Sequence, residues 1–215
     1  MNLYLRLLLA LSRGLLADRL HYRSYLISSF RVWPHDIDAF GHMNNGRYLQ
    51  IMDVARTDWM ARVGVVETMF RNRWTAVIGG GLIRYRHALK PFQRYEVKTR
   101  LLSWDQRWWY LEHVFFDQRG RQVAIGVSRA GIRQKHGWLA TDAMVEALVP
   151  GAVSPAPPSY VTDWLRLEEA MCVHATDEVP KEDPLTLETE PAAVAHDQGD
   201  SKDNLSRTLN GRTVA

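Results

Sequence analysis

The sequence DIDAFGHMNNGRY, at residues 36–48, is the stretch around which the rest of the chain has to be arranged. It places two aspartates, a histidine, two asparagines and two glycines between a strand-like apolar run and a longer apolar run of helical period. Burying so many polar groups is costly unless they pair with one another or with a ligand. We therefore interpret this turn as a candidate active site.

The run that follows the turn predicts a central helix over residues 45–64. Its apolar side chains recur at helical steps and also occupy positions between those steps, so the stripe is wider than one face. A helix that is apolar over most of its circumference is buried over most of it. Asn44 or Asn45 is suited to cap its start, and Gly64 is suited to end it. The apolar positions are Tyr48, Leu49, Ile51, Met52, Val54, Ala55, Trp59 and Val63.

One strand-like segment precedes the turn and four follow it. They lie at residues 22–34, 75–89, 95–104, 108–117 and 122–134. The short connections between the last four predict antiparallel neighbours. A single helix could hardly cover a flat sheet of five strands, so the sequence favours an α+β hotdog fold, in which the sheet wraps around the helix. A split αβ sandwich of another topology is the alternative.

The N-terminal residues 2–20 predict an amphipathic helix, because five leucines follow helical spacing. The longest uninterrupted apolar run, residues 7–11, is far shorter than the ~20 residues that span a bilayer. Two interpretations remain. The helix packs on the domain or a partner subunit, or it makes a peripheral membrane contact with its arginines at the headgroups. The leucines are Leu3, Leu7, Leu8, Leu11 and Leu15.

The C-terminal part predicts a short helix at 141–148, a Pro-rich linker at 150–158, a docking helix at 160–173 and an acidic, disordered tail. The expected division is an N-terminal helix (1–21), a hotdog domain (22–149), a linker with the docking helix (150–175) and the tail (176–215).

Composition narrows the function classes. Cys172 is the single cysteine, which fits a reducing, cytoplasmic setting, with membrane association left open. No CxxC or HExxH pattern supports a metal site.

Residues 1–150 carry 22 basic and 12 acidic residues, a net +10, whereas residues 151–215 carry 5 and 12, a net −7. A basic domain favours an anionic ligand, but its bases form no run that would favour nucleic acid, and a solvated basic face explains them equally well.

The turn also carries a specific resemblance. Residues 33–49, WPHDIDAFGHMNNGRYL, resemble the DxDxxGHxNNxxY signature of the 4-hydroxybenzoyl-CoA thioesterase-like hotdog family, most closely its thioesterase-superfamily-member-6-like branch. Residues 83–92 are similar to the family's second-strand region, and the resemblance covers about residues 25–140. It implies the hotdog fold, a homodimer or tetramer, and an acyl-CoA substrate without a further cofactor.

The resemblance implies that Asp38, the second aspartate of the DxD, is the catalytic carboxylate. In relatives that act on acyl carrier proteins an asparagine occupies the position of Phe40, so such a substrate is less supported here. The alternative is that Asp38 only caps the turn through backbone N–H groups. His42 either polarises the carbonyl, orients Asp38 or hydrogen-bonds the turn. Asp36 is expected to be structural.

Thioester hydrolysis further needs a stabiliser for the oxyanion and a hold on the leaving group. The backbone amides at the start of the central helix, from Asn44, Asn45, Gly46 and Arg47, are the candidates for the first role. The basic side chains of Arg84, Arg86 and Lys90 are candidates for contacts with the coenzyme A phosphates. A solvated or ion-paired face is the alternative for each of these three.

The sequence therefore predicts an acyl-CoA thioesterase with Asp38 as general base or nucleophile. The alternative is a non-catalytic hotdog protein that binds acyl groups or partners, at a membrane through residues 2–20. A hotdog dehydratase is less supported, because the GDxNPxH-type turn of such enzymes is absent.

Overall fold

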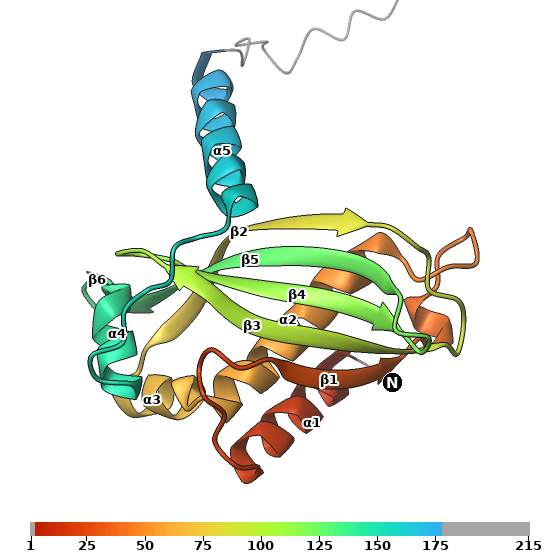
Figure 1. Ribbon diagram of the computed structural model, residues 1–215, viewed down its shortest axis with the longest axis horizontal. Coiled ribbons are helices and arrows are strands. Elements are labelled where there is room, and N and C mark those ends of the chain that lie inside the picture. The colour runs from red at the N-terminus through yellow and green to blue at the C-terminus, as the bar shows by residue number, and fades with distance from the viewer. Residues whose placement is uncertain (1–2, 178–215) are drawn as a thin grey trace, which may run out of the picture. The chain divides into compact units, whose positions relative to one another are not determined.

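An antiparallel sheet curls around one long helix in the computed structural model, which describes residues 3–177 (Figure 1). The helix is α2, Asn45–Arg62, and the strand order is β1-β3-β4-β5-β2. The predicted α+β hotdog fold is thereby confirmed. A two-residue strand, β6, also pairs with β5, so the sheet has six strands where five were predicted. The strands are β1 Leu26–Arg31, β2 Thr75–Tyr85, β3 Arg94–Trp104, β4 Trp109–Asp117, β5 Gln122–Gln134 and β6 Gly137–Trp138.

Helix α2 is buried from two sides. The sheet covers one side, and α1, Leu3–Leu16, packs against the other (Figure 1). The two helices approach closely, since a Cβ atom added to Gly14 would lie 2.5 Å from the Ala61 Cβ. This double cover is the physical reason why the sequence of α2 is apolar over most of its circumference.

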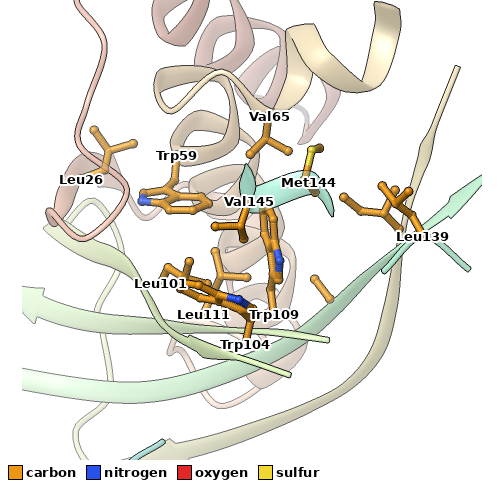
Figure 2. Packing of buried hydrophobic residues seen from close by; sticks show 12 residues of the cluster. Leu26, Trp59, Val65, Leu101, Trp104, Trp109, Leu111, Leu139, Met144 and Val145 are labelled. Atoms are coloured by element: carbon orange, nitrogen blue, oxygen red, sulfur yellow. The ribbon is translucent and has the colours of Figure 1, made fainter. Parts of the chain in front are cut away.

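Tryptophans dominate the core at the C-terminal end of α2. Figure 2 shows Trp59 of α2 gathered with Trp104 and Trp109 of the sheet and with Met144 and Val145 of α4, Thr141–Leu148. The Trp59 and Trp109 rings meet edge to face, with centroids 6.3 Å apart. Helix α3, Val65–Asn72, closes this end, with Val65 fully buried.

Strand β2 carries a β-bulge at its glycine run, residues 79–81. The register of β2 against β5 shifts between Ile78 and Gly80. A Cβ on Gly79 would overlap the Trp108 indole, and one on Gly80 would lie 3.3 Å from Trp164. Trp164 belongs to α5, Ser159–Asp177, so Gly80 lets the docking helix approach the sheet, while Gly79 makes room for Trp108.

The packing face of α1 differs from the expected one. The helix packs on the domain, as one of the two interpretations had it, but its buried residues are Arg6, Ala10 and Gly14. Of the predicted leucine stripe, Leu8 and Leu15 are 59% and 50% exposed, whereas Leu3, Leu7 and Leu11 are half-buried, so the stripe is only partly covered. No helix within residues 3–177 is long and apolar enough to cross a membrane.

The described residues bear on only part of the predicted division of the chain. The first two residues of the predicted tail, 176 and 177, end α5, and residues 178–215 lie outside the described part. The boundaries 1–21, 22–149, 150–175 and 176–215 therefore stay a prediction.

Candidate active site

The polar turn folds into a short closed loop between a 3-10 turn, Pro34–Asp36, and the start of α2. A β-bridge between Ile37 and Met43 closes its base. Within the loop, the Asp38 N–H donates to the His42 carbonyl at 2.9 Å, and the Gly41 N–H donates to the Asp38 carbonyl at 3.1 Å. Gly41 has φ +77°, a conformation that favours glycine. The loop thus holds its backbone in one conformation.

Asp38 uses its two carboxylate oxygens differently. Oδ1 accepts the Phe40 N–H at 2.9 Å and the His42 N–H at 3.5 Å. Oδ2 makes no hydrogen bond or ion pair with any residue of the described part of the chain. Asp38 therefore caps the turn, as the structural alternative expected, and still presents one oxygen to whatever binds there.

The amides at the start of α2 are not equivalent. The Asn44 N–H donates to the Asp36 carbonyl at 2.8 Å and the Arg47 N–H to the Asn44 carbonyl at 2.9 Å. The Gly46 N–H donates to the Asn44 side chain at 2.9 Å, which makes Asn44 the N-cap. Among the described residues, the Asn45 N–H has no acceptor. One of the four candidate amides is therefore available to an anion.

Asp36 holds the turn from inside. Its side chain is fully buried, and Oδ2 accepts from Arg6 Nη2 at 2.5 Å and from the Trp33 N–H at 2.9 Å. Arg47 Nε lies 3.6 Å from Oδ1, and the same guanidinium donates to the His35 carbonyl at 2.9 Å. Asp36 and the Arg47 side chain therefore tie the 3-10 turn to two helices and are structural.

His42 is half-buried, and its imidazole makes no hydrogen bond or ion pair with the described residues. The alternative in which the ring hydrogen-bonds the turn is therefore not what the structure shows. Only the His42 backbone, through its N–H and carbonyl, takes part in the loop.

The three predicted phosphate contacts lie around the end of β2. Arg84 is the penultimate residue of β2, Arg86 follows its end, and Lys90 lies in the loop to β3. All three are exposed, and none makes an ion pair within residues 3–177. Tyr85, between the two arginines, donates its hydroxyl to the Asn45 carbonyl at 2.9 Å. This bond places the end of β2 beside the helix start.

Two tyrosines, Tyr48 and Tyr85, meet beside the start of α2 and were not singled out from the sequence. Tyr48 was assigned to the apolar stripe, and Tyr85 was read as one more strand residue. Their rings meet edge to face with centroids 5.1 Å apart. Burial raises the pKa of Tyr48 to about 12, so its hydroxyl stays protonated at neutral pH. Only the contact across α2 and β2 reveals the pair, and no local pattern marks it.

No three side chains among His, Cys, Asp and Glu gather into a metal-binding group in the part of the chain that the structure describes. The turn itself offers a carboxylate oxygen, an imidazole and a backbone amide.

Sequence comparison places this turn in a known family. The model of the thioesterase-like superfamily matches residues 32–165. Protein THEM6 of Xenopus laevis is 33% identical over 141 residues, which are 65% of this chain and 66% of the frog protein. Protein THEM6 of Danio rerio is 41% identical over 85 residues, 40% and 42% of the two chains. This chain therefore spans 42–66% of the length of these two relatives.

Solved structures share the fold. A probable thioesterase from Escherichia coli, YbaW, aligns with a TM-score of 0.54 at 20% identity, over 58% of this chain and 96% of that one. The gentisyl-coenzyme A thioesterase BH1999 aligns with a TM-score of 0.51 at 20% identity, over 57% and 98%. The family match spans more than half of the chain and includes the DxDxxGHxNNxxY turn, α2 and the strands β2 to β6. The chain belongs to the thioesterase-like superfamily, in the branch of the THEM6 proteins.

Proposed function

We propose that this protein hydrolyses acyl thioesters of coenzyme A at the turn of Asp38. One observation carries the proposal. A carboxylate oxygen, Asp38 Oδ2, lies on the closed loop, and a backbone donor, the Asn45 N–H, lies at the start of the helix that follows it; neither has a partner among the described residues. These are the two groups that hydrolysis of a thioester requires: a base or nucleophile, and a donor to the oxyanion.

The proposed reaction uses both groups. Asp38 Oδ2 takes a proton from water as the water oxygen attacks the thioester carbonyl carbon. The carbonyl oxygen becomes an oxyanion and accepts a hydrogen bond from the Asn45 N–H, where the dipole of α2 also favours negative charge. The intermediate then breaks its C–S bond, and the proton held by Asp38 passes to the leaving thiolate. The products are a carboxylic acid and a thiol.

The alternative role of Asp38 is direct attack, which forms an acyl–aspartyl anhydride before water enters. A single turnover in ¹⁸O-labelled water separates the two mechanisms. Attack by water places the label in the product acid. When Asp38 attacks and water then adds to the aspartyl carbonyl of the anhydride, the product acid leaves with an unlabelled oxygen from Asp38 and the label stays on Asp38, where mass spectrometry of the peptide detects it.

Coenzyme A is proposed as the thiol because the end of β2 carries basic side chains beside the helix start. The solved neighbours include a gentisyl-coenzyme A thioesterase, which supports the same class of substrate. Arg84, Arg86 and Lys90 are exposed and unpaired with acidic residues in the described chain, so their charges are available to phosphate. Phe40 stands where the carrier-protein enzymes have asparagine, which also favours coenzyme A.

A homodimer is part of the proposal. Strand β2 lies at one edge of the sheet, with β5 on its other side. Its exposed side chains include Ile78, Leu82 and Tyr85, which are 47%, 37% and 39% exposed. An exposed, apolar strand edge is a template for pairing with another strand. Pairing of β2 with β2 of a second copy would cover these residues beside the Tyr85–Asn45 contact.

The test compares wild type with Asp38→Asn on a panel of acyl-CoA substrates of different chain length. The amide oxygen of asparagine still accepts the Phe40 N–H, so the turn is retained while the base is removed. We expect turnover to fall about 10²–10⁴-fold at unchanged thermal stability. Asp163→Asn, the same change at an exposed site on α5, is the control and keeps full turnover.

Equal turnover of Asp38→Asn and wild type would overturn the role of Asp38. A wild-type protein that binds acyl-CoA but hydrolyses no member of the panel would favour the alternative function, a non-catalytic acyl-binding protein.

A further inference from the structure

Helix α1 leaves its most apolar face uncovered. The residues that contact the domain are Arg6, Ala10 and Gly14, which recur every four residues along one side of the helix. The opposite side carries large apolar side chains that remain open to solvent, which is unusual for a helix that already has a packing partner. These residues, called here the leucine face, are Tyr4, Leu5, Leu8, Leu9, Leu15 and Leu16, exposed by 78%, 45%, 59%, 39%, 50% and 88%.

A basic pocket adjoins the leucine face. It is an open cavity of about 320 Å³ between α1 and the end of β1. Four arginines line it, together with Ser29 and the rings of Phe30 and Trp33. Arg13 connects the two surfaces, because it lines the pocket and its Nε donates to the carbonyl of Leu9 in the leucine face at 3.2 Å. The other three arginines are Arg6, Arg31 and Arg94.

The protein balances only part of the charge of this pocket, because Arg6 pairs with Asp36 and Arg13 interacts electrostatically with Asp58. By contrast, Arg31 and Arg94 make no ion pair with any acidic residue in the described chain. Arg31 and Arg94 stand directly opposite each other in the β1–β3 register. Like charges in that position destabilise a sheet. A bound anion would remove the repulsion, and guanidinium pairs suit the oxygens of a phosphate.

The leucine face and the basic pocket together match one kind of surface. A helix that lies in a membrane interface buries its apolar side in the acyl boundary and keeps its basic groups at the level of the headgroups. Juxtamembrane arginines are attracted by anionic lipids, and Trp prefers the same depth. Trp33 lies in the pocket, with the Arg31 guanidinium over its ring at 5.9 Å.

We propose that the leucine face of α1 docks this protein on an anionic phospholipid surface, with a headgroup phosphate held between Arg31 and Arg94. The site is distinct from the Asp38 oxygen and the Asn45 amide used in the proposed hydrolysis, and it does not depend on that activity. It is nevertheless joined to the turn, because Arg6 lines the pocket and binds Asp36. Docking would therefore hold the turn close to acyl thioesters that partition into the lipid.

The test is flotation of the full chain with extruded vesicles. One set is phosphatidylcholine alone, and the other contains phosphatidylserine as well. Wild type is expected to float with the anionic vesicles and to be released by added salt. Arg31→Gln/Arg94→Gln is expected to lower partitioning about 25-fold, since each arginine near anionic lipid contributes about five-fold. The control, Arg119→Gln/Arg133→Gln, makes the same charge change at exposed sites away from the pocket and keeps wild-type binding.

A second variant tests the apolar part. Leu5→Gln/Leu8→Gln/Leu16→Gln alters only exposed side chains, so its thermal unfolding should match that of wild type while flotation is lost. If the triple variant floats as wild type does, or if it changes the oligomeric state by light scattering instead, the leucine face is not a lipid contact.

Two further outcomes would overturn the proposal. Equal partitioning of wild type and Arg31→Gln/Arg94→Gln into anionic vesicles would exclude the headgroup site. Binding of inorganic phosphate or coenzyme A by calorimetry, lost in Arg31→Gln/Arg94→Gln and without any flotation of wild type, would assign the pocket to a soluble anion.

Discussion

Arg6 Nη2 lies 2.5 Å from Asp36 Oδ2, and this ion pair joins the N-terminal helix to the candidate active-site turn across 30 residues of sequence. Both side chains are buried, 4% and 0% exposed. Asp36 also receives the Trp33 N–H, and Arg6 donates to the Arg31 carbonyl at 3.3 Å. The first aspartate of the DxD therefore connects elements, while the second presents an oxygen to the site.

Asp36→Asn should destabilise the protein more than any change at Asp38. It leaves the Arg6 guanidinium buried without a counter-charge, and breaking a buried pair from one side costs about 3–5 kcal/mol. We expect that loss in the free energy of unfolding, measured by urea denaturation. Arg6→Met/Asp36→Leu, which removes both charges, should recover part of it. A loss below about 1 kcal/mol for Asp36→Asn would show that water replaces the pair.

His113 predicts a pH dependence of stability. It is fully buried on β4, with Thr99 Oγ1 3.1 Å from one ring nitrogen and Ser128 Oγ 3.1 Å from the other. Burial, and secondarily the charge of Arg56, lowers the pKa of His113 well below its ordinary 6.5. The unfolded chain therefore binds a proton that the folded chain excludes. Stability from this group is complete above about pH 6.5 and is lost as the pH falls below it.

His113→Gln is the matched variant, because its amide can bridge the two hydroxyls without titrating. Unfolding free energies measured from pH 7 to pH 5 should fall more steeply for wild type than for the variant. Parallel curves would show that the histidine is charged in the folded state or that the site opens to water. Asp117, whose pKa is lowered below 3.8, loses its contribution only at lower pH and does not interfere.

The N-cap of α2 offers a test at the helix start. Asn44 accepts the Gly46 N–H, so Asn44→Ala should cost about 1 kcal/mol of unfolding free energy, whereas Asn44→Asp should retain the bond. In the proposed mechanism the anion is held by the Asn45 amide and not by the Asn44 side chain. Asn44→Asp should nevertheless lower turnover, because it adds a negative charge beside the oxyanion. Unchanged turnover in Asn44→Asp would place the oxyanion elsewhere.

The choice of substrate can distinguish a role in phosphate binding from a role in the hydrolysis step. Arg84→Ala/Arg86→Ala should raise KM for an acyl-CoA several-fold and leave kcat nearly unchanged, because the phosphates are remote from the thioester. The same acyl group on pantetheine, which lacks the phosphates, should show no difference between the variant and wild type. A KM increase for both substrates would instead indicate that the end of β2 has been disturbed at Tyr85.

Much of this fold could be predicted because its helices and strands differ in the periodicity of their apolar residues. The central helix was expected at 45–64 and observed at Asn45–Arg62, and β5 and α4 have the expected bounds. The contact face of α1 could not be predicted in this way. Hydrophobic periodicity indicated the leucines, whereas the helix packs through Gly14 against Ala61 and through one ion pair. Neither contact has an apolar signature.

The candidate site could likewise be predicted only in part. The family resemblance pointed to Asp38, and the local pattern pointed to Asn44 or Asn45 as the cap and to the helix-start amides as a group. They could not show which amide lacks an acceptor, since that depends on the Asp36 carbonyl and the Asn44 side chain. Nor could they show that Tyr85 reaches the Asn45 carbonyl from 40 residues away. Contacts of that range follow from the curvature of the sheet.

Charged substitutions on the exposed edge of β2 should prevent formation of the proposed dimer. Ile78→Lys/Leu82→Lys puts two charges on the strand that would pair with its copy, and like charges facing across paired strands are unfavourable. Light scattering should then show a shift from dimer to monomer, and turnover should fall with it, because the Tyr85–Asn45 contact lies beside that edge. Leu167→Lys, the same type of change at an exposed position on α5, should leave both unchanged. A wild-type protein that is monomeric and fully active would mean that the turn works without a second copy, and a dimer that survives both lysines would place the interface on another surface.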